Sequence, residues 1–164
     1  MIRYEAAVNV SRSPDEVFDA VNDIGQWGSW TDMRDIRHEG TGPISVGSTG
    51  TFSLAKGPFK GPVRYVATAF DPGRRVEYRL SHPAFDWIAA MTVEPSGTGT
   101  RLGTSGTFQL RGLWRLLQPI VAGEVRRGEA AELERLKEIL EAGHAAPSAR
   151  SAADGTPRTA GGGA

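Results

Sequence analysis

The stretch AVNVSRSPDEVFDAV, residues 7–21, decides the fold because it joins a strand almost directly to a helix. Its start completes Ile2–Val10, where apolar side chains alternate with polar ones, a pattern typical of a half-buried strand. Ser13 then predicts a helix N-cap, Pro14 suits the first turn, and Glu16 completes a capping box. We therefore expect a short helix whose apolar face comprises Val17, Phe18 and Val21.

The middle of the chain reads as a series of strands. A second short helical turn is expected over residues 24–30, which places Trp27 and Trp30 on one side. Turn sequences such as 71–73 and 95–97 then divide runs of alternating apolar and polar residues. Because these turns are short, antiparallel pairing is expected. The predicted strands are 33–39, 48–54, 62–70, 75–80, 85–94 and 100–110.

A long helix is expected to close the domain, over about residues 113–142. Apolar residues recur there at helical spacing, first from Leu113 to Val121 and again from Leu133 to Leu140. Pro119 lies inside the first group and predicts a kink or a break near the first turns.

The end of the chain differs sharply in composition. Residues 143–164 contain no Val, Ile, Leu, Met or aromatic residue and consist largely of Gly, Ala, Pro and Ser. Such a segment cannot offset the entropy of ordering by burying apolar surface. We therefore expect a folded domain over residues 1–142 and a disordered tail over 143–164.

Composition excludes several classes of function. The chain of 164 residues has no cysteine, so disulfides, thiolate metal sites and cysteine nucleophiles are excluded. Its 19 Lys and Arg balance 19 Asp and Glu, which argues against nucleic acid as a partner. No apolar run is long enough to span a membrane, and the first residues lack the pattern of a signal peptide. We expect a cytoplasmic protein, monomeric or homodimeric.

Several motifs mark a family. They are Val10-x-x-Ser13-Pro14-x-x-Val17-Phe18, Trp27-x-x-Trp30, Phe70-Asp71-Pro72-x-Arg74-Arg75-Val76-x-Tyr78, Val93-Glu94-Pro95, Gly99-Thr100-Arg101-Leu102 and the Leu/Pro pattern opening the last helix. With the order of elements, they resemble the SRPBCC (START-like) superfamily over residues 1–142, and most closely its polyketide cyclase/dehydrase and lipid-transport family. The resemblance implies an α+β helix-grip fold: a curved seven-stranded antiparallel sheet wrapped around a long C-terminal helix, with two short helices after the first strand.

The resemblance also implies an apolar cavity between the sheet and the last helix. Small residues on predicted inner faces and in the last helix favour a hollow there, and a general bias of the composition toward Ala and Gly is the alternative explanation. Core packing is the alternative for the aromatic residues. The residues expected to line the cavity are Trp27, Trp30, Phe52, Tyr78, Trp87, Ala89, Met91, Thr104, Gly106 and Gly123.

The family that the sequence resembles has no universal set of catalytic residues, so no catalytic role can be transferred to a position of this chain. Three residues are candidates on their own chemistry. Tyr78 could donate a hydrogen bond from an inner face, and His38 could act as a base if it points inward rather than lying at an edge. Arg64 could polarise a carbonyl only if its strand turns that face inward; otherwise it is a solvated cation. Two separated histidines without cysteine predict no metal site, and we expect no cofactor.

Three functions remain open at this level. The first is binding of a small hydrophobic molecule, aromatic, polyketide-like or lipid-like, in the cavity. The second is a polyketide cyclase or dehydratase that uses polar groups of the cavity. The third is a co-chaperone-like interaction module, which charged residues on the outer strand faces disfavour.

Overall fold

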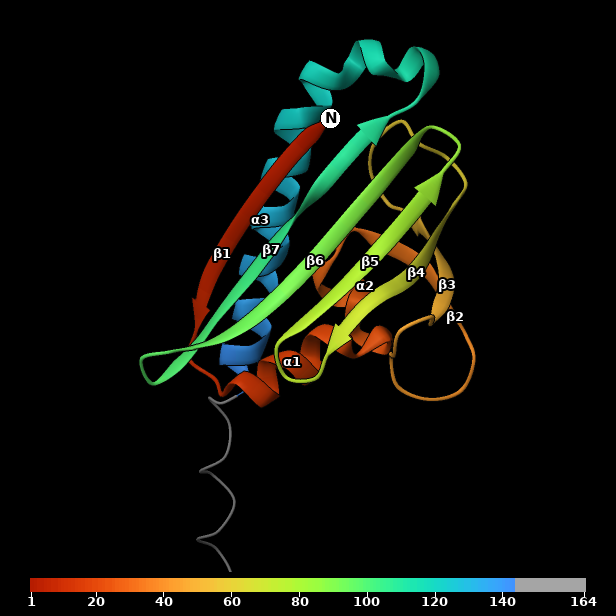
Figure 1. Ribbon diagram of the computed structural model, residues 1–164. Coiled ribbons are helices and arrows are strands. Elements are labelled where there is room, and N and C mark those ends of the chain that lie inside the picture. Colours follow the sequence, from red (N-terminus) through yellow and green to blue (C-terminus); the bar gives the residue numbers. More distant parts are fainter. Residues whose placement is uncertain (144–164) are drawn as a thin grey trace, which may run out of the picture.

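The computed structural model describes residues 1–143, in which one curved sheet wraps around a long helix (Figure 1). The strands are β1 (Ile2–Val10), β2 (Met33–Glu39), β3 (Thr49–Leu54), β4 (Pro62–Asp71), β5 (Arg75–His82), β6 (Phe85–Ser96) and β7 (Gly99–Leu110). The helical segments are α1 (Pro14–Asn22), η1 (Ile24–Gln26), α2 (Trp27–Trp30), η2 (Gly112–Leu117) and α3 (Gln118–Ala142). The residues beyond Gly143, on which most of the predicted tail falls, lie outside the described part of the chain.

The sheet follows a simple order, β1-β7-β6-β5-β4-β3-β2, with every neighbouring pair antiparallel. Consecutive strands from β2 to β7 pair as hairpins, and β1 closes the row beside β7, so β1 and β2 form the two edges. The pairing register shifts in β2 between Arg34 and Arg37, and in β4 between Ala67 and Ala69. Such irregularities bend strands, as a sheet that wraps around a helix requires. The expected seven-stranded helix-grip fold is therefore confirmed.

The connection from β1 to α1 forms as its sequence predicts. The Glu16 backbone N–H donates to Ser13 Oγ at 3.3 Å, and the Ser13 backbone N–H donates to Glu16 Oε2 at 3.0 Å. This capping box satisfies two backbone groups that would otherwise lack partners. The apolar face of α1 turns inward, and Val17, Phe18 and Val21 are buried.

The last helix begins later than the sequence predicts. Residues 112–117 form the 3-10 segment η2, and α3 starts at Gln118 with Pro119 in its first turn. Gly112, at φ +53°, turns the chain away from the end of β7, so this segment lies beyond the sheet (Figure 1). As a result Leu113 and Leu116 are 87% and 80% exposed, although both belong to the apolar pattern from which the long helix is predicted.

The body of α3 lies along the concave face of the sheet, behind β1 and β7 in Figure 1. Its 25 residues span about 37 Å. Leu133 and Leu136 are the residues of α3 that are fully buried against the core. Within residues 1–143, no helix is both long enough and apolar enough to cross a bilayer.

Candidate functional site

A cavity of about 60 Å³ lies where α2, α3 and the concave face of the sheet meet. By volume it can hold several water molecules or part of a small ligand. Its wall is mostly apolar. The lining residues are Val21, Trp27, Trp30, Thr31, Met33, Phe52, Tyr65, Tyr78, Leu80, Trp87, Ala89, Met91, Thr104, Glu129, Glu132 and Leu133.

Most residues proposed for the cavity from the sequence lie at its wall. The alternation along β5, β6 and β7 turns their side chains to the concave face, and α2 adds its two tryptophans. The structure brings together Trp27, Trp30, Phe52, Tyr78, Trp87, Ala89, Met91 and Thr104.

Two proposed cavity residues do not line it, and each glycine has another reason to be small. A Cβ built on Gly106 would lie 2.6 Å from Tyr4 Oη and would collide with the Ile88 carbonyl oxygen. Gly106 therefore makes room for the Tyr4 side chain and does not open a hollow. In α3, a Cβ on Gly123 would meet only the Arg127 guanidinium, at 3.5 Å.

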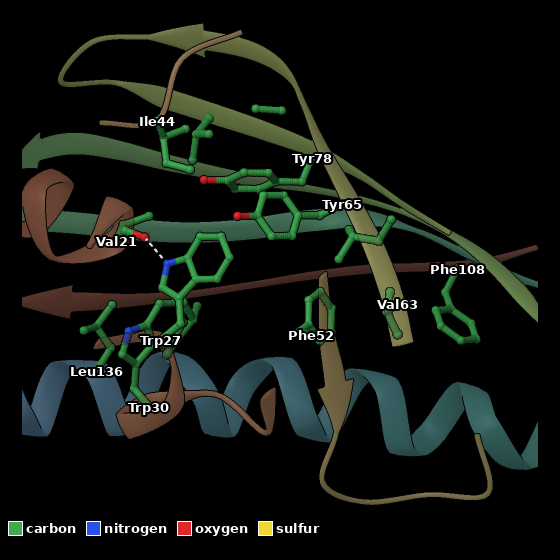
Figure 2. Close-up of a cluster of buried hydrophobic side chains, with 14 of the residues drawn as sticks. Val21, Trp27, Trp30, Ile44, Phe52, Val63, Tyr65, Tyr78, Phe108 and Leu136 are labelled. Carbon is green, nitrogen blue, oxygen red and sulfur yellow. Dashed lines mark hydrogen bonds between the residues drawn. The ribbon is translucent and has the colours of Figure 1, made fainter. Parts of the chain in front are cut away.

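Packed aromatic rings form one side of the cavity. The Trp27 ring meets both Tyr65 and Tyr78 edge-on, with centroids 5.5 Å apart in each case. The Trp27 indole N–H donates to the Val21 carbonyl at 2.9 Å, which fixes the ring (Figure 2). These contacts hold the aromatic wall in one arrangement, as a preformed binding site requires.

Two polar groups at the cavity wall are buried without a hydrogen-bonding partner among the described residues. They are the Tyr78 hydroxyl and the Trp30 indole N–H. Tyr78 is 7% exposed and Trp30 is 5% exposed. Burial raises the pKa of Tyr78 above its ordinary value, so its hydroxyl stays protonated and able to donate. Figure 2 shows the Tyr78 ring beside Tyr65, with both hydroxyls pointing toward the same side.

His38 contacts Tyr65, which lines the cavity, but His38 itself is not part of the cavity wall. Its Nδ1 shares a 2.9 Å hydrogen bond with the Tyr65 hydroxyl, and the two rings are parallel with centroids 6.5 Å apart. Burial, followed by the charge of Glu39, raises the pKa of Tyr65 to about 12. His38 is half-buried and does not reach the cavity wall, so any contact with a ligand passes through Tyr65.

Arg64 lies on the outer face of the sheet. In this part of β4, Val63 and Tyr65 turn inward, and the Arg64 side chain stays exposed. Its guanidinium lies 3.6 Å from Glu39 in a surface ion pair. Because it points away from the cavity, Arg64 cannot polarise a carbonyl bound there.

Two acidic residues of the cavity are absent from the candidates that sequence reasoning produced. Glu129 and Glu132 extend from α3 to the cavity wall. The sequence does contain a pattern that could identify them. Glu129 and Glu132 precede the buried Leu133 and Leu136 by four residues each, so all four side chains share one face of the helix.

Glu129 ends a short chain of hydrogen bonds. The Trp87 indole N–H donates to Tyr4 Oη at 2.7 Å, Tyr4 contacts Thr104, and the Thr104 hydroxyl donates to Glu129 Oε2 at 3.0 Å. Burial, with a smaller effect of the neighbouring Glu132, raises the pKa of Glu129 to about 8. Near neutral pH the cavity therefore contains a carboxylic acid that is largely protonated.

Glu132 has more partners. Its Oε1 accepts from the Asp32 backbone N–H at 3.0 Å and lies 3.8 Å from Arg135 Nη2. Burial raises the pKa of Glu132 to about 7, with the Asp32 hydrogen bond and Arg135 acting in the opposite direction. Within residues 1–143, no three His, Asp or Glu side chains converge as a group that could hold a metal ion.

A curved antiparallel sheet that holds a long helix over an apolar cavity defines a helix-grip protein, as the resemblance to the SRPBCC superfamily implies. A family model described as polyketide cyclase / dehydrase and lipid transport matches residues 1–141, and the chain belongs to this family. Membership in this family supports ligand binding in general terms. A search of curated proteins finds no significant match.

Solved structures share the fold at low sequence identity. The protein TTHA0849 from Thermus thermophilus has a TM-score of 0.70 at 16% identity and covers 87% of this chain and 99% of its own. The structure of Ara h 8.0201 has a TM-score of 0.65 at 16% identity, and the match covers 85% of this chain and 97% of Ara h 8.0201. A third structure is a norcoclaurine synthase point mutant from Thalictrum flavum in complex with a transition-state analogue. It has a TM-score of 0.64 at 12% identity, and the match covers 86% of this chain and 94% of the synthase. At these identities the similarity shows the fold alone.

Proposed function

We propose that the chain binds a small hydrophobic molecule in the cavity between the sheet and α3. The observation that carries the proposal is an apolar cavity whose buried polar groups, Tyr78 Oη and Trp30 Nε1, have no protein partner within residues 1–143. Buried polar groups are normally paired, so a site that leaves two donors free is suited to a ligand with a few polar atoms.

The experiment compares binding before and after the cavity is filled. Purified protein is examined by native mass spectrometry for a co-purified molecule and titrated with Nile red, a neutral fluorescent probe. Ala89→Leu places an isopropyl group at the cavity wall and is expected to abolish binding. Ala131→Leu, on the exposed side of α3, is the matched control. Unchanged binding by a folded Ala89→Leu protein, or no binding by the native protein, would contradict the proposal.

A second candidate function is cyclase or dehydratase chemistry, and the Tyr78 hydroxyl favours it. Of the three catalytic candidates, Tyr78 lies at the cavity wall, whereas His38 and Arg64 do not. A protonated phenol there can donate a hydrogen bond to a substrate carbonyl and so polarise it. Turnover of polyketide thioesters by the native protein and its loss in Tyr78→Phe would support this function; no turnover of any such thioester would count against it.

A further inference from the structure

The ionisable groups of the cavity wall include carboxyls but no cationic side chain from residues 1–143. Glu129 and Glu132 both line the cavity, and the wall contains no Lys, Arg or His from residues 1–143. A site for a purely hydrocarbon ligand gains nothing from a buried carboxyl, because burial without a partner costs free energy. The two acids therefore need an explanation beyond apolar packing.

Glu132 has a structural explanation. Its hydrogen bond from the Asp32 backbone N–H ties α3 to the segment that follows α2. Arg135 reinforces this tie, since its Nε donates to the Trp30 carbonyl at 2.8 Å and its Nη2 lies 3.6 Å from Asp32 Oδ1. Glu132 thus has both a hydrogen-bond donor and a cation beside it.

Glu129 has no comparable explanation. Its hydrogen bond comes from Thr104 to Oε2, and Oε1 has no partner among residues 1–143. The charged group that acts on it most directly is another acid, Glu132, which opposes its ionisation. A carboxyl at a cavity wall with one free oxygen and no cation is suited to a positively charged ligand atom.

The surrounding wall fits the rest of such a ligand. Six aromatic side chains line the cavity and can contact an apolar body or a cation: Trp27, Trp30, Phe52, Tyr65, Tyr78 and Trp87. The unpartnered Tyr78 hydroxyl and Trp30 N–H are independent of the acids and also point to a ligand with polar atoms.

We propose that the cavity binds small organic amines, with Glu129 as the counter-ion of the protonated nitrogen and the aromatic wall around the apolar body. This inference rests on the proposed function and names the ligand class. The inference also predicts selectivity among ligands. A ligand that ends in a carboxylate would face Glu129 with no cation in the wall and should have the lowest affinity.

Binding of an amine should release a proton. An ammonium group beside Glu129 favours its ionised form, so below pH 8 the acid loses its proton when the ligand arrives. The titratable and charged groups around the two acids are Tyr4 from β1, Asp32 and Lys56 from loops, and Arg135 from α3. Alkyl amines stay protonated here, so their affinity should rise by up to about tenfold per pH unit between pH 6 and 8.

Three probes with one body separate the effect of charge from that of apolar contact: 4-phenylbutylamine, 4-phenylbutanol and 4-phenylbutanoate. Isothermal titration calorimetry at pH 7.5 is expected to show the amine binding about tenfold tighter than the alcohol, with the carboxylate weakest. Glu129→Gln keeps the shape and should lose about tenfold for the amine while the alcohol is unaffected. Glu134→Gln, on the exposed side of the same helix, is the matched control and should bind like the native protein.

The outcomes are distinguishable. Equal or tighter binding of the alcohol, or unchanged amine affinity in Glu129→Gln, overturns the amine assignment and leaves the proposed function intact. Failure of all three probes and of Nile red overturns both. If Glu129→Gln does not fold by circular dichroism, native protein is titrated in two buffers of different ionisation enthalpy. At pH 6.5, where a carboxyl with a pKa of about 8 is almost fully protonated, release of close to one proton with the amine and none with the alcohol supports the assignment, and no release with the amine overturns it.

Discussion

The Thr104 hydroxyl of β7 donates a 3.0 Å hydrogen bond to Glu129 Oε2 of α3, joining the sheet to the helix at the cavity wall. This bond favours the ionised carboxyl, yet burial outweighs it and the pKa of Glu129 stands at about 8. The native state therefore holds a proton that the unfolded chain has already released at neutral pH.

The first prediction concerns pH and stability. Between the ordinary glutamate pKa near 4.5 and the folded value of about 8, the native state binds more protons than the unfolded chain. The free energy of unfolding should therefore fall as pH rises through this window, by on the order of 2–4 kcal/mol from this residue. Chemical denaturation at pH 5 and pH 8.5 measures the difference.

Glu129→Gln should remove most of this slope, so the variant should be more stable than the native protein at pH 8.5. Glu132, whose pKa is raised to about 7, should leave a smaller residual slope. The exposed Glu134→Gln control should keep the native pH dependence. A slope as steep in Glu129→Gln as in the native protein would show that this carboxyl is not buried in its acid form.

The second prediction contrasts two glycines. Gly106→Ala should lower the free energy of unfolding by about 2 kcal/mol or more, because the new Cβ collides with the Ile88 carbonyl and crowds Tyr4 Oη. Gly123→Ala should raise it by about 0.5–1 kcal/mol, because alanine favours the helix and the Cβ meets only a flexible arginine. Urea denaturation of both variants checks the pair, and equal effects would contradict the assigned roles.

The third prediction contrasts two tyrosine hydroxyls. Tyr78→Phe removes a buried hydroxyl without a partner among residues 1–143, so stability should stay unchanged or rise by about 1 kcal/mol. Tyr65→Phe removes the partner of His38 Nδ1 and should cost about 1 kcal/mol. Thermal unfolding by circular dichroism compares them. A larger loss for Tyr78→Phe than for Tyr65→Phe would mean that the Tyr78 hydroxyl has a partner in the folded protein.

Local signals account for what the sequence predicted well. The capping box at Ser13 and Glu16 depends on residues three apart, so it is readable without tertiary information. The inner faces of β5 to β7 follow from strict alternation. Tyr78, Trp87 and Met91 could therefore be proposed for the cavity wall from the sequence, whereas Tyr65 of β4 could not.

The orientation of β4 could not be read because odd-numbered residues turn toward the core before the bulge and the even-numbered Phe70 turns toward it after the bulge. Val63 and Tyr65 turn toward the core, and after the shift between Ala67 and Ala69 the Phe70 ring packs edge-on against Phe18, with centroids 5.5 Å apart. The core-facing residues of β4 are therefore odd-numbered before the bulge and even-numbered after it. The position of the bulge places the even-numbered Arg64 on the outer face.

Glu129 was missed for a different reason. Its hydrogen-bond partner, Thr104, lies 25 residues away on another element. On the sequence alone, a glutamate in a helix rich in charges is most simply a solvated residue. The signal is its place on the same face as Leu133 and Leu136.

The last prediction tests the break before α3. Leu116 belongs to the apolar pattern of the expected long helix, but in η2 it is 80% exposed, whereas Leu133 is 1% exposed. Leu116→Ala should therefore change the free energy of unfolding by less than about 0.5 kcal/mol, while Leu133→Ala should lower it by about 2–5 kcal/mol. Urea denaturation with a shared m-value measures both. A loss for Leu116→Ala comparable to that for Leu133→Ala would mean that residues 112–117 pack against the protein in solution, as one continuous helix would require.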